Sequence, residues 1–188
     1  NLLPFGASVL VTWAAPMIPL LQEDHPPVGI KPMTQDQASW LMSIGCIAPM
    51  FALPLANILS ERYGRKVLGC LIAIPITASW LLTIFANSFS CLLTARILAG
   101  VGNGMTIFLV PIYIAEIANN KIRGKLGSFL VFAINIGTLI GFIFGATMSY
   151  ETFATCGLML PIIFLMGFIF MPETPIYLMR KGHIESAT

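Results

Sequence analysis

Long apolar stretches alternate with short polar segments along the whole chain, and this pattern predicts its architecture. A helix needs about 20 mostly apolar residues to cross the hydrocarbon core of a bilayer. The stretches that approach or exceed this length are residues 2–21, 38–59, 67–86, 89–115, 126–150 and 153–171. None of them alternates polar and apolar residues as a membrane-barrel strand would. Because a helix also satisfies its own backbone hydrogen bonds in lipid, the sequence predicts an all-α membrane protein with six transmembrane helices.

Composition supports lipid as the solvent for this chain. Hydrophobic residues make up 57% of the sequence, charged residues make up 10%, and the mean hydropathy is +0.87. A soluble domain carries about 25% charged residues. The formal net charge of +2 does not indicate a nucleic-acid partner, because the basic residues do not lie on one continuous face.

Basic residues gather in the segments that would lie on one side of the membrane. These residues are Arg62, Arg65, Lys66, Lys121, Arg123, Lys125, Arg180 and Lys181. The segments on the other side carry Lys31 among the acidic residues Glu23, Asp24, Asp36 and Glu151. Since Lys and Arg are enriched in cytoplasmic loops, we expect the first side, and therefore both ends of the bundle, to be cytoplasmic.

Arg96 is the one ionisable residue deep inside a predicted span. A charge at the centre of a membrane helix costs at least about 2.5–3.5 kcal/mol, so it normally faces the bundle interior or a water-filled cavity. Two interpretations are open: the side chain extends outward to the membrane surface, or it lines a cavity or locks helices together. No Asp or Glu within a span is available to pair with it. Its expected partners are backbone carbonyls, polar side chains, or groups outside this sequence.

Charged residues also bracket the predicted cytoplasmic helix ends. The acidic and basic members are Glu61, Arg62, Arg65, Glu116, Arg123 and Glu173. Solvated flanks of the spans explain the bases well, but they explain less well three carboxylates on the same basic side. The alternative is a set of ion pairs that ties helix ends together in one conformation and releases them in another. Each exposed ion pair contributes about 0–1 kcal/mol of stability. A set of such weak pairs could favour one conformation of a gate without locking it.

The sequence shows no pattern typical of an enzyme. It contains no G-x-S-x-G, no H-E-x-x-H and no phosphate-binding glycine-lysine loop. Cys46, Cys70, Cys91 and Cys156 lie within apolar stretches, without a C-x-x-C pair or a nearby His. We therefore interpret the cysteines as packing residues and expect no catalytic residues, no cofactor and no metal site.

Five short motifs occur in order along the chain. They are E-R-Y-G-R-K at 61–66, R-I-L-A-G-V-G-N-G at 96–104, P-I-Y-I-A-E-I at 111–117, R-G-K-L-G at 123–127 and P-E-T-P at 172–175. Through these motifs the chain resembles the amino-terminal half of a sugar porter of the major facilitator superfamily, across essentially all of its length. Within that family it is most similar to the insect facilitated trehalose transporters.

The resemblance implies a twelve-helix transporter of two halves that works by alternating access, with its substrate bound near the membrane midplane. Residues 1–171 would form the first six-helix bundle and 172–188 the start of a cytoplasmic linker. The implied partners are a small sugar, the lipid bilayer and a second six-helix half. The implied location is the plasma membrane, as a multi-pass protein.

The resemblance also assigns candidate roles to individual residues. Positions that match the substrate cavity of the family, or its helix-four arginine, are Thr12, Trp13, Arg96, Asn135 and Thr138. The cytoplasmic residues Glu61, Arg62, Arg65, Glu116, Arg123 and Glu173 match the ion-pair positions of the family. Val131 stands where many glucose-type members carry a sugar-binding Gln.

The predicted function is facilitated diffusion of a hexose or of trehalose. Proton-driven transporters usually carry a carboxylate within the membrane, and these spans hold none. One alternative is a facilitator for organic ions, in which a cavity around Arg96 would hold a carboxylate. Another is a sensor or truncated half-molecule that transports nothing.

Overall fold

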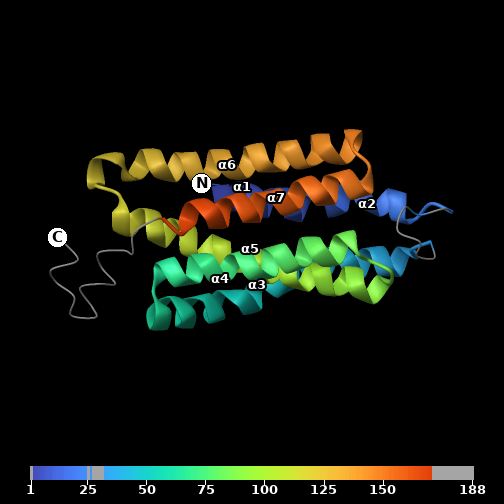
Figure 1. Ribbon diagram of the computed structural model, residues 1–188, viewed down its shortest axis with the longest axis horizontal. Helices are drawn as coiled ribbons and strands as arrows, with labels where there is room; N and C mark the ends of the chain where they lie inside the picture. The colour runs from blue at the N-terminus through green and yellow to red at the C-terminus, as the bar shows by residue number, and fades with distance from the viewer. Residues whose placement is uncertain (1, 25, 27–31, 171–188) are drawn as a thin grey trace.

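The computed structural model describes residues 2–24, 26 and 32–170, and its regular structure there is helical (Figure 1). The helices are α1 (Leu2–Thr12), α2 (Ala14–Leu21), α3 (Gln35–Tyr63), α4 (Arg65–Ile84), α5 (Phe89–Ile117), α6 (Asn120–Thr147) and α7 (Tyr150–Phe168). α1 and α2 together form one membrane-length segment, so the described part of the chain holds six such segments. The predicted all-α, six-helix fold is confirmed.

Helix ends extend beyond several of the predicted apolar stretches. α6 begins at Asn120, whereas hydropathy predicts a start at residue 126, because its first turns are polar and basic. α3 begins at Gln35 because Thr34 accepts a hydrogen bond from the Gln37 amide, and the Gln37 side chain accepts one from the Thr34 amide. Hydropathy does not detect polar residues that cap a helix in this way. The proposed linker 172–188 lies outside the described residues.

Two local features set the path of the chain at helix junctions. α1 and α2 are separated at Trp13, where Pro16 lacks an N–H and its ring crowds the carbonyl of Thr12. Between α3 and α4 stands the single residue Gly64, with φ of 97°, a conformation that glycine adopts without steric cost. The first feature bends a membrane segment and the second reverses the chain direction at one residue.

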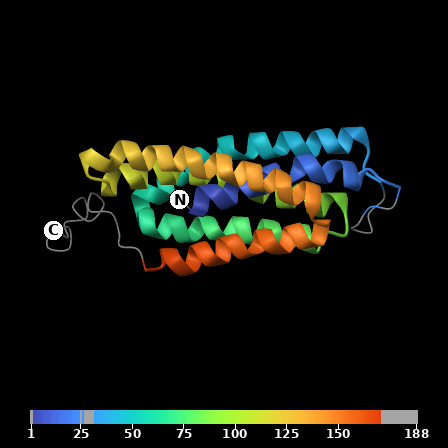
Figure 2. The same cartoon turned by 90° about the horizontal axis from the view of Figure 1, so that it is seen from above.

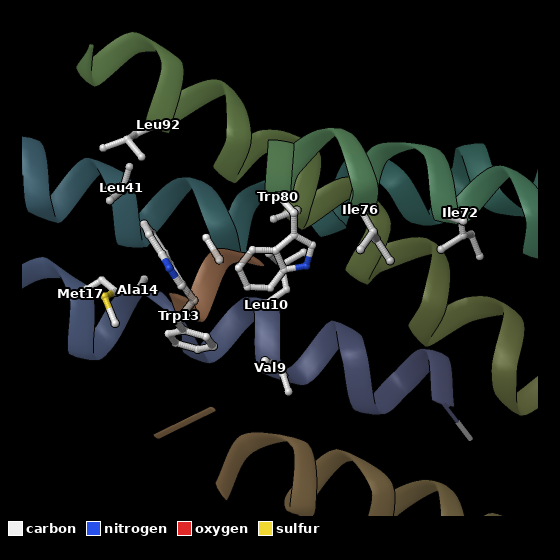
Figure 3. Packing of buried hydrophobic residues seen from close by; sticks show 14 of the residues in the cluster. Val9, Leu10, Trp13, Ala14, Met17, Leu41, Ile72, Ile76, Trp80 and Leu92 are labelled. Carbon is white, nitrogen blue, oxygen red and sulfur yellow. The ribbon is translucent and has the colours of Figure 1, made fainter. Parts of the chain in front are cut away.

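The helices run up and down along one common axis, as Figures 1 and 2 both show. The segment Leu2–Leu21 is the most enclosed, with 61% of its apolar window buried, against 11% for the window in α6. α1 packs on α5, α6 and α7, while α5 also packs on α3 and α4. Leu10 of α1 and Met17 of α2 belong to the same buried hydrophobic cluster as Leu41 of α3 and Trp80 of α4 (Figure 3).

Several helix pairs approach so closely that a side chain would not fit between them. A Cβ atom on Gly104 would lie 2.7 Å from the backbone oxygen of Pro49 in α3. A Cβ atom on Gly137 would lie 2.5 Å from the backbone oxygen of Phe5 in α1. Small residues spaced four apart allow such backbone contact between membrane helices. These glycines hold α3 against α5 and α1 against α6.

Candidate functional site

A groove of about 350 Å³ lies between α1, α5 and α6, and we call it the α1–α5–α6 groove. It is lined by Pro4, Ala7, Ser8, Val11, Thr12, Asn103, Thr106, Ile107, Pro111, Leu130, Ile134 and Thr138. None of these lining residues is charged. The groove is therefore an apolar surface that carries a few neutral polar groups, as binding sites for small neutral molecules commonly do.

The hydroxyl groups of this groove share one hydrogen-bonding arrangement. Ser8 and Thr12 on α1 each donate to the carbonyl oxygen four residues earlier, at 2.8 Å. Thr106 on α5 and Thr138 on α6 do the same, at 2.7 and 3.0 Å. Because each hydroxyl proton is used within its own helix, the oxygen lone pairs remain as acceptors. These four hydroxyls are suited to accept hydrogen bonds from the hydroxyl groups of a ligand.

The structure places Thr12 and Thr138 in the groove lining, and Asn135 beside it. Asn135 lies one turn before Thr138 on α6, is exposed, and donates to the carbonyl oxygen of Val131 at 2.9 Å. Asn103 and Thr106 also line the groove, and neither is among the residues predicted from the sequence. Their spacing of three residues on a membrane helix was an available signal for a shared polar face.

Arg96 and Trp13 lie away from the groove, in the interior of the bundle. The Arg96 side chain is 5% exposed, and its Nη1 donates to the carbonyl oxygen of Leu10 at 3.0 Å. Its guanidinium carbon lies 4.5 Å from the centroid of the Trp13 ring. Trp13 is 2% exposed and meets Tyr150 of α7 edge-on at 5.5 Å between centroids. The interpretation that Arg96 extends outward to the membrane surface is wrong, because its side chain is directed at α1.

The Arg96 contacts join α1 to α5, and Tyr150 extends the connection to α4 and α7. The hydroxyl of Tyr150 donates to the carbonyl oxygen of Thr83 at 2.7 Å. Thr12 and Trp13 follow one another in the chain, so their side chains leave the segment in directions roughly 100° apart. Thr12 therefore lines the groove, while Trp13 contacts Arg96 and Tyr150 in the interior of the bundle.

Replacing Arg96 with lysine tests this locking role. Lysine retains the charge but loses the planar guanidinium that lies over Trp13, and a cation–π contact contributes about 0.5–2 kcal/mol. We expect R96K to lower the free energy of unfolding of the full-length protein in detergent by about 1–2 kcal/mol. An unchanged thermal unfolding curve would show that the stacking contributes nothing measurable.

A second cluster lies at the end of the bundle where α3 is followed by α4 and α5 by α6. Arg65 at the start of α4 meets Glu116 near the end of α5, with Nη2 2.9 Å from Oε1 and Nε 3.1 Å from Oε2. The side chains are 8% and 10% exposed. Nη1 of Arg65 donates to the carbonyl oxygen of Ser60 at 3.2 Å. One guanidinium thus connects the ends of α3, α4 and α5.

The other predicted gate residues lie at the same end of the bundle or outside the described chain. Arg123 donates from Nη2 to the carbonyl oxygen of Ala115 at 2.8 Å, and so caps the last turn of α5. The guanidinium of Arg62 lies 5.7 Å from the centroid of the Tyr63 ring, and Glu61 is exposed. Glu173 lies outside the described residues. Of the predicted gate residues, which were not assigned partners from the sequence, Arg65 and Glu116 form an ion pair in the structure.

The six membrane-length segments in the described part of the chain have the fold of about half of a major facilitator. The xylose transporter XylE from E. coli, in a partially occluded, inward-open conformation, superimposes with a TM-score of 0.80 at 22% identity. The match covers 99% of this chain and 52% of that chain. The proton:xylose symporter XylE bound to 6-bromo-6-deoxy-D-glucose gives a TM-score of 0.79 at 23% identity.

Residues 15–188 match the family described as "Sugar (and other) transporter", and the chain belongs to that family. It is 31% identical over 184 residues to the facilitated glucose transporter member 8 of solute carrier family 2 from Bos taurus. It is 33% identical over 155 residues to the facilitated trehalose transporter Tret1 from Polypedilum vanderplanki. These matches cover 98% and 82% of this chain but 38% and 31% of the relatives' own lengths.

The comparisons confirm the predicted membership of the major facilitator sugar porters and the similarity to trehalose transporters. The chain is accordingly an integral, multi-pass membrane protein. The relatives are named as transporters and not as enzymes. Since the chain spans about a third of the length of these relatives, the activity of the whole protein is a matter for proposal.

Proposed function

We propose that the whole protein carries a neutral sugar, a hexose or trehalose, across the membrane by facilitated diffusion. The α1–α5–α6 groove would supply the part of the sugar site that belongs to this half of the transporter. The observation that carries the proposal is the lining of this groove, which is apolar with hydroxyl and amide groups and holds no charged side chain. The names of the relatives, transporters of glucose and of trehalose, point to the same class of substrate.

The position of Arg96 argues against an organic anion as the substrate. A carboxylate substrate would need a cation in the groove to compensate for its lost hydration. Arg96 is instead directed at the carbonyl oxygen of Leu10 and the ring of Trp13, and it is not among the residues that line the groove. A facilitator for organic anions is therefore the weaker candidate.

The absence of an acidic residue from the groove lining supports uniport over proton symport. A proton relay within a membrane normally uses Asp, Glu or His. Among the described acidic residues, Asp36, Glu61, Glu116 and Glu151 lie in the end turns of their helices, and Glu23 and Asp24 lie in the connection after α2. The described residues therefore place no carboxylate in the groove lining that could bind a transported proton.

We also propose that the protein works by alternating access. It would lie in the plasma membrane, with the Arg65–Glu116 end of the bundle on the cytoplasmic side. The basic residues at that end, among them Arg62, Lys66 and Lys125, favour the cytoplasmic side. The Arg65–Glu116 pair would hold the ends of α4 and α5 together while the cytoplasmic mouth is closed. Thr12, Asn135 and Thr138 would contact or flank the sugar, and Arg96 and Trp13 would hold α1 in place behind them.

Uptake by the full-length protein in proteoliposomes tests this function. We expect labelled glucose or trehalose to equilibrate across the membrane, and an organic anion and an organic cation to stay out. A proton uncoupler should leave the initial rate unchanged. Abolition of uptake by the uncoupler would contradict uniport, and accumulation of either ion without any sugar uptake would contradict the sugar assignment. Empty liposomes supply the background rate.

A further inference from the structure

Asn103 lies at the centre of α5, with 14 residues of the helix on either side (103 − 89 = 14 and 117 − 103 = 14). It is half-buried and lines the α1–α5–α6 groove. A polar amide at the middle of a membrane helix is unfavourable in contact with lipid. Its position on the groove therefore suggests a functional role. The midplane is also where transporters built from two repeats bind their substrates.

Within the described structure, the Asn103 side chain differs from the other polar groups of the groove in having no hydrogen bond. Ser8, Thr12, Thr106 and Thr138 each donate to a carbonyl of their own helix. No side-chain hydrogen bond of Asn103 occurs within residues 2–24, 26 and 32–170. Its amide offers two N–H donors and one carbonyl acceptor. The hydroxyls around it offer acceptor lone pairs, so Asn103 supplies the uncommitted donors of the described groove.

The two glycines beside Asn103 explain why its side chain has this direction. A Cβ atom on Gly102 would lie 2.5 Å from the side chain of Ile76 in α4. A Cβ atom on Gly104 would lie 2.7 Å from the backbone oxygen of Pro49 in α3. These close contacts set the rotation of α5 about its axis. With α3 and α4 occupying the faces of the neighbouring glycines, residue 103 is left on the face toward α1 and α6.

We propose that Asn103 determines substrate specificity by binding two neighbouring hydroxyl groups of a neutral sugar. Its N–H group donates to the oxygen of one hydroxyl, while its carbonyl accepts the proton of the next. Adjacent hydroxyls on a pyranose ring present a donor and an acceptor side by side, which matches a single amide. The inference rests on the proposed transport of a neutral sugar. It adds the residue that recognises the arrangement of hydroxyl groups on that sugar.

The variant Asn103→Leu tests the proposal, because leucine has the same branching and nearly the same size but no hydrogen-bonding atoms. Uptake of labelled glucose and of labelled trehalose is measured with the full-length protein in proteoliposomes, below the KM of the wild type. We expect the rate for the transported sugar to fall about tenfold through a higher KM, since two neutral hydrogen bonds are lost. Asn87→Leu, in the exposed α4–α5 connection, is the matched control and should retain the wild-type rate.

Competition by monodeoxy analogues of the transported sugar supplies the second measurement. In the wild type, the analogue that lacks a hydroxyl bound by Asn103 should inhibit about tenfold less well than the parent sugar. In Asn103→Leu that analogue and the parent sugar should inhibit equally, because the partner group is gone. Asn103→Ser, a smaller change, serves the same comparison if the leucine variant does not fold.

The outcomes separate the inference from the proposed function. Wild-type uptake with an unchanged rate and unchanged analogue ranking in Asn103→Leu would overturn the role of Asn103 alone. A wild-type protein that carries no sugar would overturn the proposed function, and this is seen before any variant is made. A fall in maximal rate with unchanged KM and ranking would identify Asn103 as a packing residue and would also overturn its role.

Discussion

Replacing Gly104 with valine is expected to lower the yield of folded full-length protein severely. The new Cβ would lie 2.7 Å from the backbone oxygen and 2.8 Å from the Cα atom of Pro49. Backbone atoms have no alternative rotamer, so α3 and α5 must separate along their shared contact. Overpacking of this kind costs about 1–3 kcal/mol, and we expect the upper end of that range. Thermal unfolding of the detergent-purified protein, together with the recovered monodisperse fraction, measures the effect.

Gly167→Val is the matched control for that substitution. Gly167 lies near the end of α7, and a Cβ atom added there has no neighbour within 4 Å in the described structure. The same change of residue type therefore costs little there beyond the modest helix preference against β-branched side chains. Equal unfolding temperatures for the two variants would mean that α3 and α5 do not touch through Gly104.

Glu116→Ala is expected to be the most destabilising single change at the charged end of the bundle. It removes the carboxylate that accepts hydrogen bonds from Nε and Nη2 of the nearly buried Arg65 guanidinium. Removing one partner of a buried ion pair costs about 3–5 kcal/mol. We expect a loss of about 3 kcal/mol in the free energy of unfolding, with reduced sugar uptake.

Glu151→Ala provides the comparison for Glu116→Ala, because Glu151 is exposed in the first turn of α7 at the opposite end of the bundle. It should change stability by less than about 1 kcal/mol. The double variant Arg65→Leu with Glu116→Leu should be more stable than Glu116→Ala, because it removes the nearly buried cation together with its carboxylate. If Glu116→Ala and Glu151→Ala unfolded at the same temperature, the pair would count as an ordinary surface contact.

The fold could be predicted because it follows from the lengths of apolar stretches. Hydropathy alone located the six membrane-length segments, since a spanning helix must satisfy its backbone internally and stay apolar for its whole length. The ends were displaced where polar residues continue the helix, as at the start of α6 and at the Thr34 cap of α3. Hydropathy reports the solvent around a residue, whereas a helix end depends on where the last backbone hydrogen bond closes.

The candidate site could be predicted in part. The motifs singled out Arg65 and Glu116, and the structure places them within hydrogen-bonding distance of each other. Thr12 and Trp13 were selected together as cavity residues, yet they face different sides of the same segment. Asn103 was passed over, although it stands inside the motif that drew attention to Arg96. A sequence motif identifies candidate residues, but the direction of each side chain depends on how its helix is rotated about its own axis.

By itself, the sequence determined the solvent, the number of membrane segments, the charge asymmetry of the two ends and the transporter family. These depend on composition and order along the chain, which are one-dimensional properties. Tertiary structure alone decided that Arg96 turns inward to the Leu10 carbonyl and that Asn103 faces the groove. The reason is that contacts of Gly102 and Gly104 with two other helices set the rotation of α5, and no stretch of sequence contains those neighbours.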